Sequence, residues 1–340
     1  MRLHLEAVVL RGAIEESRHL FECGLADLDG RLVAGTAQPG LVSTFRSSAK
    51  PFQLLPLVER GHADRWGFSD AQLAVMAASH TGSREHIRLV SGILERIGRT
   101  PADLICGYHD PEDPESREDV FGGSTPRNAL YNNCSGKHAG ILALALAEGW
   151  PIAGYERLEH PVQQLLRRTV AEVCGLAPEA LGIAVDGCGL IVFALPLAAM
   201  ARGYAVLAAA AASSDGDTRT RALGRIGRVM GTQPMIVEGA GRLSTALMQV
   251  TRGRVIAKGG AEGLQLVALT DRAQGLALKC EDGAGRALGP VLVTLLEQLG
   301  ALSAAEASGL ESVRRPPIRN AAGEIVGGIE ARVHAIAAVQ

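Results

Sequence analysis

Long uncharged segments are scarce in this chain of 340 residues. The longest stretch without Asp, Glu, Lys or Arg runs over residues 187–201, contains Pro196, and is shorter than the roughly 20 residues that a membrane span needs. The apolar run at residues 7–10 ends at Arg11 and is too short for the apolar core of a secretory signal. We therefore expect no membrane-spanning helix and a cytoplasmic location.

Strong net charge and paired cysteine motifs are also missing. The net charge of −2 provides no cationic field that would attract nucleic acid or anionic lipid, so neither is an expected partner. The six cysteines include no CxxC pair, which argues against a zinc ribbon or a thioredoxin-like motif. In a reducing cytoplasm these cysteines are free thiols or metal ligands. With 47% hydrophobic and 21% charged residues, the composition is that of a globular protein.

Lysine is rare, because only four of the 34 basic residues are lysines and the remaining 34 − 4 = 30 are arginines. Arginine stays protonated in proteins, whereas lysine can lose its proton and act as a base or a metal ligand. Each lysine is therefore a candidate for special chemistry, although a genome that favours arginine would also leave a few residual lysines. The four are Lys50, Lys137, Lys258 and Lys279.

Strand-like patterns occur at both ends of the chain, and helical patterns dominate between them. This order predicts an α+β fold, in which an antiparallel sheet forms from both termini, helices pack on it, and a helical lobe is inserted. No GxGxxG motif follows a strand, which argues against a dinucleotide-binding fold. We expect a single catalytic domain, 1–340, with a sheet lobe (about 1–50 and 240–340) and a mostly helical lobe (about 51–239). Residues 107–127, with six acidic residues, are predicted to be a surface loop or lid.

Ser47 and Lys50 form a Ser-x-x-Lys motif where a strand-like run gives way to a helix. Residues three apart on a helix share a face, so the lysine amine can reach the serine hydroxyl and activate it as a nucleophile. The positive end of the helix would favour the developing alkoxide. The alternative interpretation is that Ser47 or Ser48 only caps the helix.

Two more polar segments adjoin apolar elements. Residues 79–83, Ser-His-Thr-Gly-Ser, join two predicted helices, and as a helix connection they need no function. Lys258 follows an apolar strand and precedes two glycines, which permit a ligand to approach the backbone closely. The same pattern is also compatible with an exposed lysine before an ordinary turn.

Two cysteines, Cys134 and Cys188, are flanked by polar and glycine residues. Cys134 precedes an apolar helix whose first backbone amides would stabilise a thiolate, and Cys188 lies in a turn after a strand. With Lys137, His138 and Asp186 near them in sequence, the two thiols could form a zinc site. Their separation of 54 residues, however, is no recognised ligand spacing.

Taken together and in order, these segments resemble the rhizobial-type L-asparaginase family, which is unrelated to the threonine-dependent bacterial asparaginases. The resemblance covers nearly the whole chain, and its most specific strings are SSAKPFQ, SHTGSREH, NNCSGKHAG and VDGCG. It implies a fold like that of the serine β-lactamases and glutaminases, which agrees with the layout predicted above. It also suggests a homodimer.

The resemblance implies a role for each polar segment. Ser47 with Lys50 forms one Ser-Lys tandem, and Ser79 with Lys258 forms the second. One zinc ion is implied, with the role of orienting the substrate rather than attacking it. The zinc ligands are Cys134, Lys137 and Cys188, and the expected substrate contacts are Arg46, Asp186 and His138.

These roles predict hydrolysis of L-asparagine to L-aspartate and ammonia through an acyl-enzyme. Ser47 attacks the side-chain amide carbon, and a neutral Lys50 takes its proton. Ser79 relays protons or holds the substrate, and Lys258 lowers the pKa of Lys50 by like-charge proximity. The sequence leaves open which serine carries the ester.

Two other functions are compatible with the same residues. A thiol amidohydrolase would use Cys134 as the nucleophile and His138, one helical turn later, as the base. A non-catalytic, zinc-dependent amino-acid-binding protein would keep a penicillin-binding-like scaffold without turnover.

Overall fold

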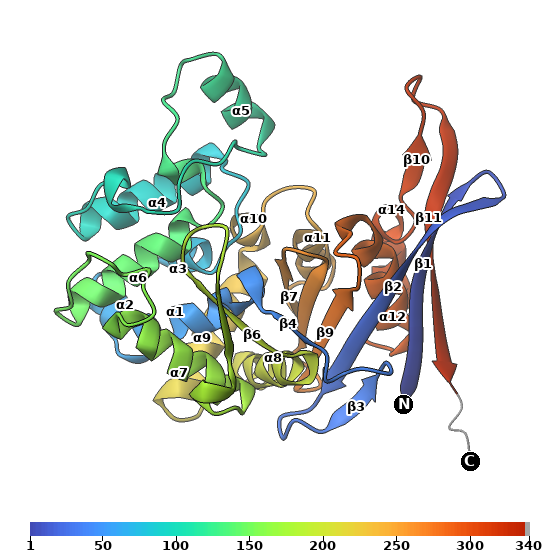
Figure 1. Ribbon diagram of the computed structural model, residues 1–340, viewed down its shortest axis with the longest axis horizontal. Coiled ribbons are helices and arrows are strands. Elements are labelled where there is room, and N and C mark those ends of the chain that lie inside the picture. The colour runs from blue at the N-terminus through green and yellow to red at the C-terminus, as the bar shows by residue number, and fades with distance from the viewer. Residues whose placement is uncertain (337–340) are drawn as a thin grey trace.

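The computed structural model describes residues 1–336, and it places a large β-sheet beside a group of helices (Figure 1). The strands of the large sheet are β1 (Arg2–Arg11), β2 (Ile14–Ala26), β3 (Leu32–Gly35), β7 (Val255–Gly260), β8 (Leu264–Leu269), β9 (Gln274–Cys280), β10 (Pro317–Arg319) and β11 (Ile325–Ile336). Their order across the sheet is β10-β11-β1-β3-β2-β9-β8-β7. The pairings are antiparallel, except that Arg2 of β1 pairs in parallel with Gly35 of β3.

The first and last strands of the described chain lie side by side. β1 pairs with β11 from Arg2 opposite Ile336 to Arg11 opposite Gly327. The strands β1–β3 and β7–β11 of this sheet come from the two end regions of the described chain, and the residues between β3 and β7 are inserted between them. The predicted α+β class, with an antiparallel sheet from both termini, is confirmed.

Two helices, α8 (Leu197–Ala212) and α12 (Leu288–Gln298), pack on the large sheet. α8 lies against β9, β2 and β8, whereas α12 lies against β11 and β1. At the crossing of α8 and β9 the two backbones touch, because a Cβ atom on Gly275 would lie 2.0 Å from the carbonyl oxygen of Ala201. Only glycine permits so close an approach.

The remaining helices of the middle of the chain form the helical lobe, at the left of Figure 1. Ser69 and Ser83 each begin a helix with a reciprocal capping box. The helices of this lobe are α1 (Lys50–Glu59), α2 (His62–Arg65), α3 (Asp70–Met76), α4 (Arg84–Arg96), α5 (Pro114–Phe121), α6 (Ser135–Ala147), α7 (Pro161–Cys174), α9 (Thr218–Thr232) and α10 (Pro234–Val237), whereas α11 (Leu243–Val250) packs on β7 of the large sheet. A small sheet of β4 (Val42–Thr44), β6 (Ile191–Pro196) and β5 (Gly182–Val185) adjoins them, and α13 (Ala304–Gly309) and α14 (Glu311–Arg314) lie beside α12.

The structure differs from the sequence-based expectation in two segments. The patterns do not predict β6 or α8, because both are buried on several sides and their apolar residues follow no clear period of two or 3.6. Residues 107–127 are not only loop, since they contain α5, whose first turn is capped by the Asp113 side chain accepting from the Ser116 amide. Within residues 1–336, no helix combines the length and apolar character that crossing a bilayer requires.

The contact between β9 and α8 generates a stability prediction. We expect Gly275→Ala to lower the free energy of unfolding by about 1–3 kcal/mol or more, because the added methyl group forces the strand and the helix apart. Gly285→Ala is the matched control, since a Cβ atom there would meet nothing within 4 Å. Chemical denaturation of both variants measures the difference, and equal stability would contradict the packing described here.

Candidate active site

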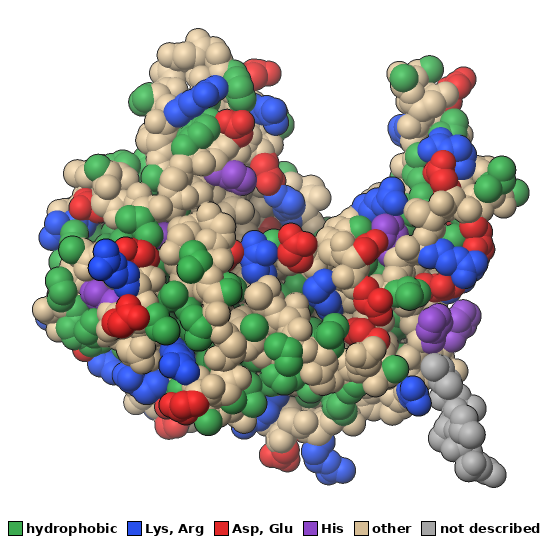
Figure 2. Space-filling view, in the orientation of Figure 1, with side chains coloured by type: hydrophobic (Ala, Val, Ile, Leu, Met, Phe, Trp, Pro, Cys, Tyr) green, Lys and Arg blue, Asp and Glu red, His purple; other side chains and the backbone are tan. Residues whose placement is uncertain are grey.

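A cavity of about 440 Å³ lies where the helical lobe meets the end of β7. The surface of the molecule is hollowed between the end that carries α5 and the end that carries β10 and β11 (Figure 2). Most of the cavity wall comes from segments just before or after helices and strands, where side chains are free to point inward. The lining residues are Arg46, Ser47, Ser79, His109, Glu112, Asn132, Asn133, Cys134, Asp186, Gly187, Cys188, Glu238, Arg242, Gly259, Gly260 and Ala261.

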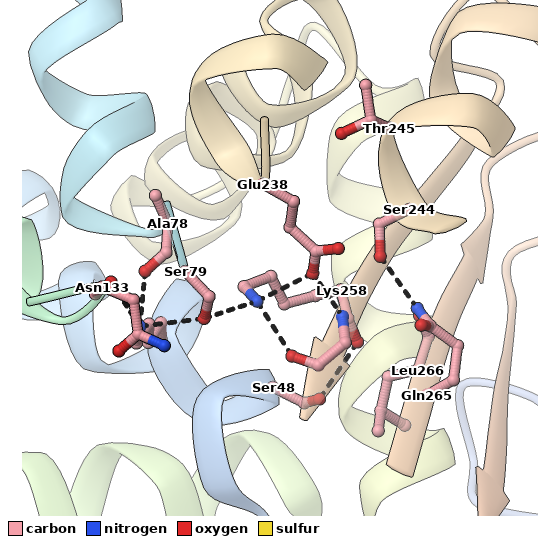
Figure 3. Close-up of polar contacts among 12 residues, drawn as sticks. Ser48, Ala78, Ser79, Asn133, Glu238, Ser244, Thr245, Lys258, Gln265 and Leu266 are labelled. Carbon is pink, nitrogen blue, oxygen red and sulfur yellow. Dashed lines mark hydrogen bonds and ion pairs between the residues drawn. The ribbon is translucent and has the colours of Figure 1, made fainter. Parts of the chain in front are cut away.

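The Ser79 hydroxyl lies between two buried lysine amines (Figure 3). Its Oγ is 3.0 Å from Nζ of Lys50, at the start of α1, and 2.8 Å from Nζ of Lys258, on β7. Both lysines are 0% exposed. The structure therefore brings together the predicted tandem of Ser79 with Lys258. The same Ser79 hydroxyl also contacts Lys50, which was expected to pair with Ser47.

The two amines have different partners. Nζ of Lys258 also contacts Oε1 of Glu238 at 2.9 Å and the carbonyl oxygen of Gly259 at 2.8 Å. The other partners of Lys50 are two carbonyl oxygens, those of Ala78 and Asn133. Lys258 thus has a carboxylate counter-charge, whereas within residues 1–336 no carboxylate contacts the Lys50 amine and its acidic neighbour is the Cys134 thiol.

The pKa of Lys50 lies at about 8, below the ordinary lysine value. Burial is the largest cause of this lowered pKa; Cys134 opposes it, and the charges of Lys137 and Lys258 lower it further. The like charge of Lys258 lowers this pKa as expected from the sequence, and burial of the amine is the larger effect.

Ser47 lines the cavity but lies outside the expected helix. Residues Arg46–Ala49 form one turn of 3-10 helix, and α1 begins only at Lys50. Within residues 1–336, no hydrogen bond joins the Ser47 hydroxyl to Lys50, contrary to the expectation from their spacing. Neither Ser47 nor Ser48 caps α1 through its side chain, so the capping alternative is also wrong. Ser48 instead donates to the carbonyl oxygen of Lys258, 3.0 Å away.

Arg46 and Asp186 form an ion pair in the cavity wall. Nε of Arg46 lies 2.9 Å from Oδ1 of Asp186, although the two residues are 140 positions apart in sequence. Arg46 has a φ of 46°, a left-handed conformation that is unfavourable for a side chain as large as arginine. Backbone strain of this kind is found where the surrounding structure holds a residue for a function.

Cys134, Lys137 and Cys188 come together at the cavity wall, which both cysteines line. Nζ of Lys137 lies 3.1 Å from Sγ of Cys188, and all three residues are at most 6% exposed. A hydrogen bond from Cys188 lowers the pKa of Cys134 well below its ordinary value, and the charge of Lys137 acts in the same direction. Two sulfur donors and one amine nitrogen, buried side by side, are a donor set that suits zinc.

Comparison with known proteins identifies the family. The chain matches the family model described as L-asparaginase II over residues 7–331. This chain belongs to the L-asparaginase II family. The family resemblance seen in the sequence is therefore confirmed, and the family supports an amidohydrolase of the asparaginase type that acts on a small molecule.

No curated protein matches this member of the L-asparaginase II family. Similar solved structures include a β-lactamase from Mycobacterium bovis, with 13% identity and a TM-score of 0.41, which covers 83% of this chain and 95% of its own. A structure titled Mglu has 19% identity and a TM-score of 0.36, and covers 83% of this chain and 67% of its own. Both TM-scores are low, so the fold is assigned here from the strand order itself.

His138 does not reach the cavity of this family member. It is 0% exposed on α6, and its Nδ1 lies 2.7 Å from the hydroxyl of Tyr155. Burial lowers the pKa of His138 well below its ordinary value, and the charges of Lys137 and Lys50 add to this effect. Contrary to the expected substrate contact, His138 is not among the residues that line the cavity, and its Nδ1 is engaged with Tyr155.

Sequence reasoning missed several polar residues of the cavity. Glu238 and Arg242 lie in the connection between α10 and α11, for which no motif or spacing gave a signal. Glu112 and His109 belong to residues 107–127, which were predicted to be a loop or lid. The acidic composition of that segment was the one sequence feature that could have pointed to them. Glu112 forms an ion pair with Arg242, and its backbone amide donates to the carbonyl oxygen of Thr81. This segment thus contacts two other parts of the cavity wall.

The buried pair of Lys258 and Glu238 predicts a large effect on stability. We expect Glu238→Gln to lower the free energy of unfolding by about 3 kcal/mol, because it leaves a buried ammonium without its counter-charge. A double variant with Lys258→Met should lose less than the sum of the single changes. The control is Glu85→Gln in the exposed pair with Arg88, where the expected loss is below about 1 kcal/mol. Additive losses in the double variant would contradict the pairing.

Proposed function

We propose that this protein hydrolyses the side-chain amide of L-asparagine to L-aspartate and ammonia through a serine acyl-enzyme. The observation that carries the proposal is the Ser79 hydroxyl held between two buried lysines, next to Ser47 in the same cavity. The family supports the reaction class, and the arrangement of these groups supports the mechanism.

The hydrogen-bond partners suggest which lysine is neutral. Lys258 has three acceptors, namely Glu238, the Gly259 carbonyl and Ser79, which suits an ammonium with three protons. A neutral Lys50 can donate its two protons to the carbonyls of Ala78 and Asn133 and accept from Ser79 with its lone pair. Ser79 then accepts from one lysine and donates to the other, which is the arrangement that a proton relay needs.

The reaction begins with attack of Ser47 Oγ on the side-chain amide carbon. As the new C–O bond forms, Lys50 accepts the serine proton, directly or through Ser79. The proton then passes to the amide nitrogen, the C–N bond breaks, and ammonia leaves. A water molecule, deprotonated by the same base, hydrolyses the ester to aspartate and regenerates Ser47.

Arg46 and Asp186 are suited to the charged end of the substrate. We assign the α-carboxylate to the guanidinium of Arg46 and the α-amino group to the carboxylate of Asp186, because each is the opposite charge in the cavity wall. Both are already held by their mutual ion pair. An amide that lacks the α-carboxylate or the α-amino group would lose its contact with Arg46 or Asp186 and should bind more weakly.

Cys134, Lys137 and Cys188 would hold the zinc ion, with Lys137 binding as a neutral amine. Bound by these residues, the ion would help to position the substrate, and the two thiolates would offset its charge. The nucleophile in this proposal is Ser47, and its proton passes to Lys50 directly or through Ser79. Cys134 and Cys188 also lie in the cavity wall, so the ligand set joins the turn at 186–189 to the start of α6.

The substrate assignment predicts a strong preference among small amides. L-Asparagine should be hydrolysed faster than succinamate, which lacks the α-amino group, and propionamide, which lacks both charged groups, by at least about 100-fold in kcat/KM. Ammonia release from each amide measures this preference. Equal rates would indicate a general amidase, and no release from asparagine would support the amino-acid-binding alternative.

The role of Lys50 predicts that Lys50→Arg lowers kcat by about 100-fold or more. Arginine keeps the positive charge but does not become neutral, so general-base catalysis is lost. Arg60→Lys, at the end of α1, is the control and should keep full activity.

Mass spectrometry of acid-quenched reactions identifies the nucleophile. An aspartyl ester on Ser47 that is absent from Ser47→Ala is the expected result. An ester on Ser79 would mean that Ser79, and not Ser47, is the nucleophile. A thioester on Cys134 would support the thiol amidohydrolase instead.

Zinc removal should raise KM more than it lowers kcat, provided that KM follows binding. Cys188→Ala should reproduce this change because it removes one ligand. Steady-state kinetics on protein from which a chelator has removed zinc measures the changes in KM and kcat separately, with folding checked by circular dichroism. A lost kcat with unchanged KM would contradict the orienting role.

A further inference from the structure

A second group of metal-ligating side chains lies on the large sheet, outside the cavity. His19 lies on β2, Cys280 is the last residue of β9, and Asp282 follows in the next turn. In the register of β2 and β9, Phe21 is opposite Cys280, so His19, two residues from Phe21, points to the same face as Cys280. The turn then brings Asp282 over both residues.

The donor atoms of the three side chains converge. Nδ1 of His19 lies 2.6 Å from Oδ2 of Asp282, and Sγ of Cys280 lies 3.0 Å from Oδ1 of the same carboxylate. The nitrogen, the sulfur and a carboxylate oxygen all lie within 4.8 Å of one another. His19 and Cys280 are buried, whereas the Asp282 side chain is 49% exposed, which leaves a path from solvent.

We propose that His19, Cys280 and Asp282 form a binding site for a zinc-like divalent cation. One imidazole nitrogen, one thiolate and one carboxylate oxygen are the donor types that zinc selects, and water completes a tetrahedral set. In such a set the donor atoms lie roughly 3.3–3.7 Å apart, somewhat farther than the two contacts of the Asp282 carboxylate here, which are 2.6 and 3.0 Å. Asp282 lies in an exposed turn, so its carboxylate is free to make this adjustment.

Metal binding changes the protonation of Cys280 and His19. Without metal, the Asp282 carboxylate accepts from the His19 ring and from the Cys280 thiol. On binding, the thiol proton leaves to solvent, and the imidazole proton moves from Nδ1 to Nε2. One thiolate and one carboxylate then neutralise the two positive charges of the ion.

Arg286 opposes this binding mode. Its Nε donates to Nε2 of His19 at 3.0 Å, and its Nη2 donates to Ser17 at 3.1 Å. A metal on Nδ1 requires a proton on Nε2, which would place two donors face to face. Binding therefore displaces the exposed guanidinium, and Arg286 lowers the affinity of the site.

The site adjoins the hairpin that carries Lys258. The backbone amide of Cys280 donates to the carbonyl oxygen of Gly263, 2.8 Å away, at the turn between β7 and β8. Gly259, Gly260 and Ala261, on the same hairpin, line the cavity. A bound ion would tie β2, β9 and the following turn together beside this hairpin, which is a structural role.

Zinc titration of metal-stripped protein against a chromophoric chelator tests the proposal. The background is Cys188→Ala, which removes a sulfur ligand from the cavity set and makes the test independent of that set. We expect the Cys188→Ala protein to bind one equivalent of zinc. The matched control adds Cys23→Ala, which removes another buried cysteine, on β2, and should still bind one equivalent. The equivalent should disappear with Cys280→Ala. Failure to bind, or zinc that persists without Cys280, would overturn the proposal.

Cobalt binding and Arg286→Ala give two further readouts. Cobalt in the Cys188→Ala background should show a thiolate-to-metal absorption band that Cys280→Ala abolishes. Arg286→Ala should tighten zinc binding by about three- to tenfold, the equivalent of one hydrogen bond of roughly 1 kcal/mol. Arg315→Ala, at an exposed arginine on the same lobe, should change nothing. Unchanged or weaker binding in Arg286→Ala would contradict ligation through Nδ1.

Discussion

The burial of two lysine amines around one serine hydroxyl is the constraint on which the rest of this structure depends. An ammonium removed from water is costly unless hydrogen bonds and counter-charge replace its hydration. Lys258 obtains both from Glu238 and the Gly259 carbonyl, whereas Lys50 obtains only carbonyl and hydroxyl partners. The lowered pKa of Lys50 follows from that difference, because a poorly compensated buried amine is more stable when neutral.

This arrangement needs support from distant parts of the chain. Lys258 is delivered by β7 at the edge of the large sheet, and Ser79 and the carbonyl oxygen of Ala78 come from the segment after α3. The amide of Ser79 donates to the carbonyl oxygen of Val237, so the serine is attached to the segment that leads to Glu238. Close backbone contacts such as that between β9 and α8 keep the sheet and the helices in register.

Much of the fold and part of the candidate site could be predicted from local sequence. Ser69 and Ser83 act within a few residues, so their capping boxes are readable without tertiary information. The apolar run that contains β6 and α8 was not readable, because elements buried on several sides lose their periodicity. His138 looked available in sequence because polar residues precede it, yet its place on α6 turns the ring to Tyr155. Glu238 carried no local signal, since its importance comes only from its contact with Lys258.

The sequence by itself determined the α+β class, the terminal strands of the sheet, the family and the identity of about half of the polar residues in the cavity. These depend on periodicity, capping and motif strings, which are properties of neighbouring residues. Only the tertiary structure decided that Lys50 contacts Ser79 rather than Ser47, that Glu238 is the counter-charge of Lys258, and that Arg46 pairs with Asp186. Pairings between residues up to 140 positions apart follow from the packing of whole elements, and no local pattern contains that information.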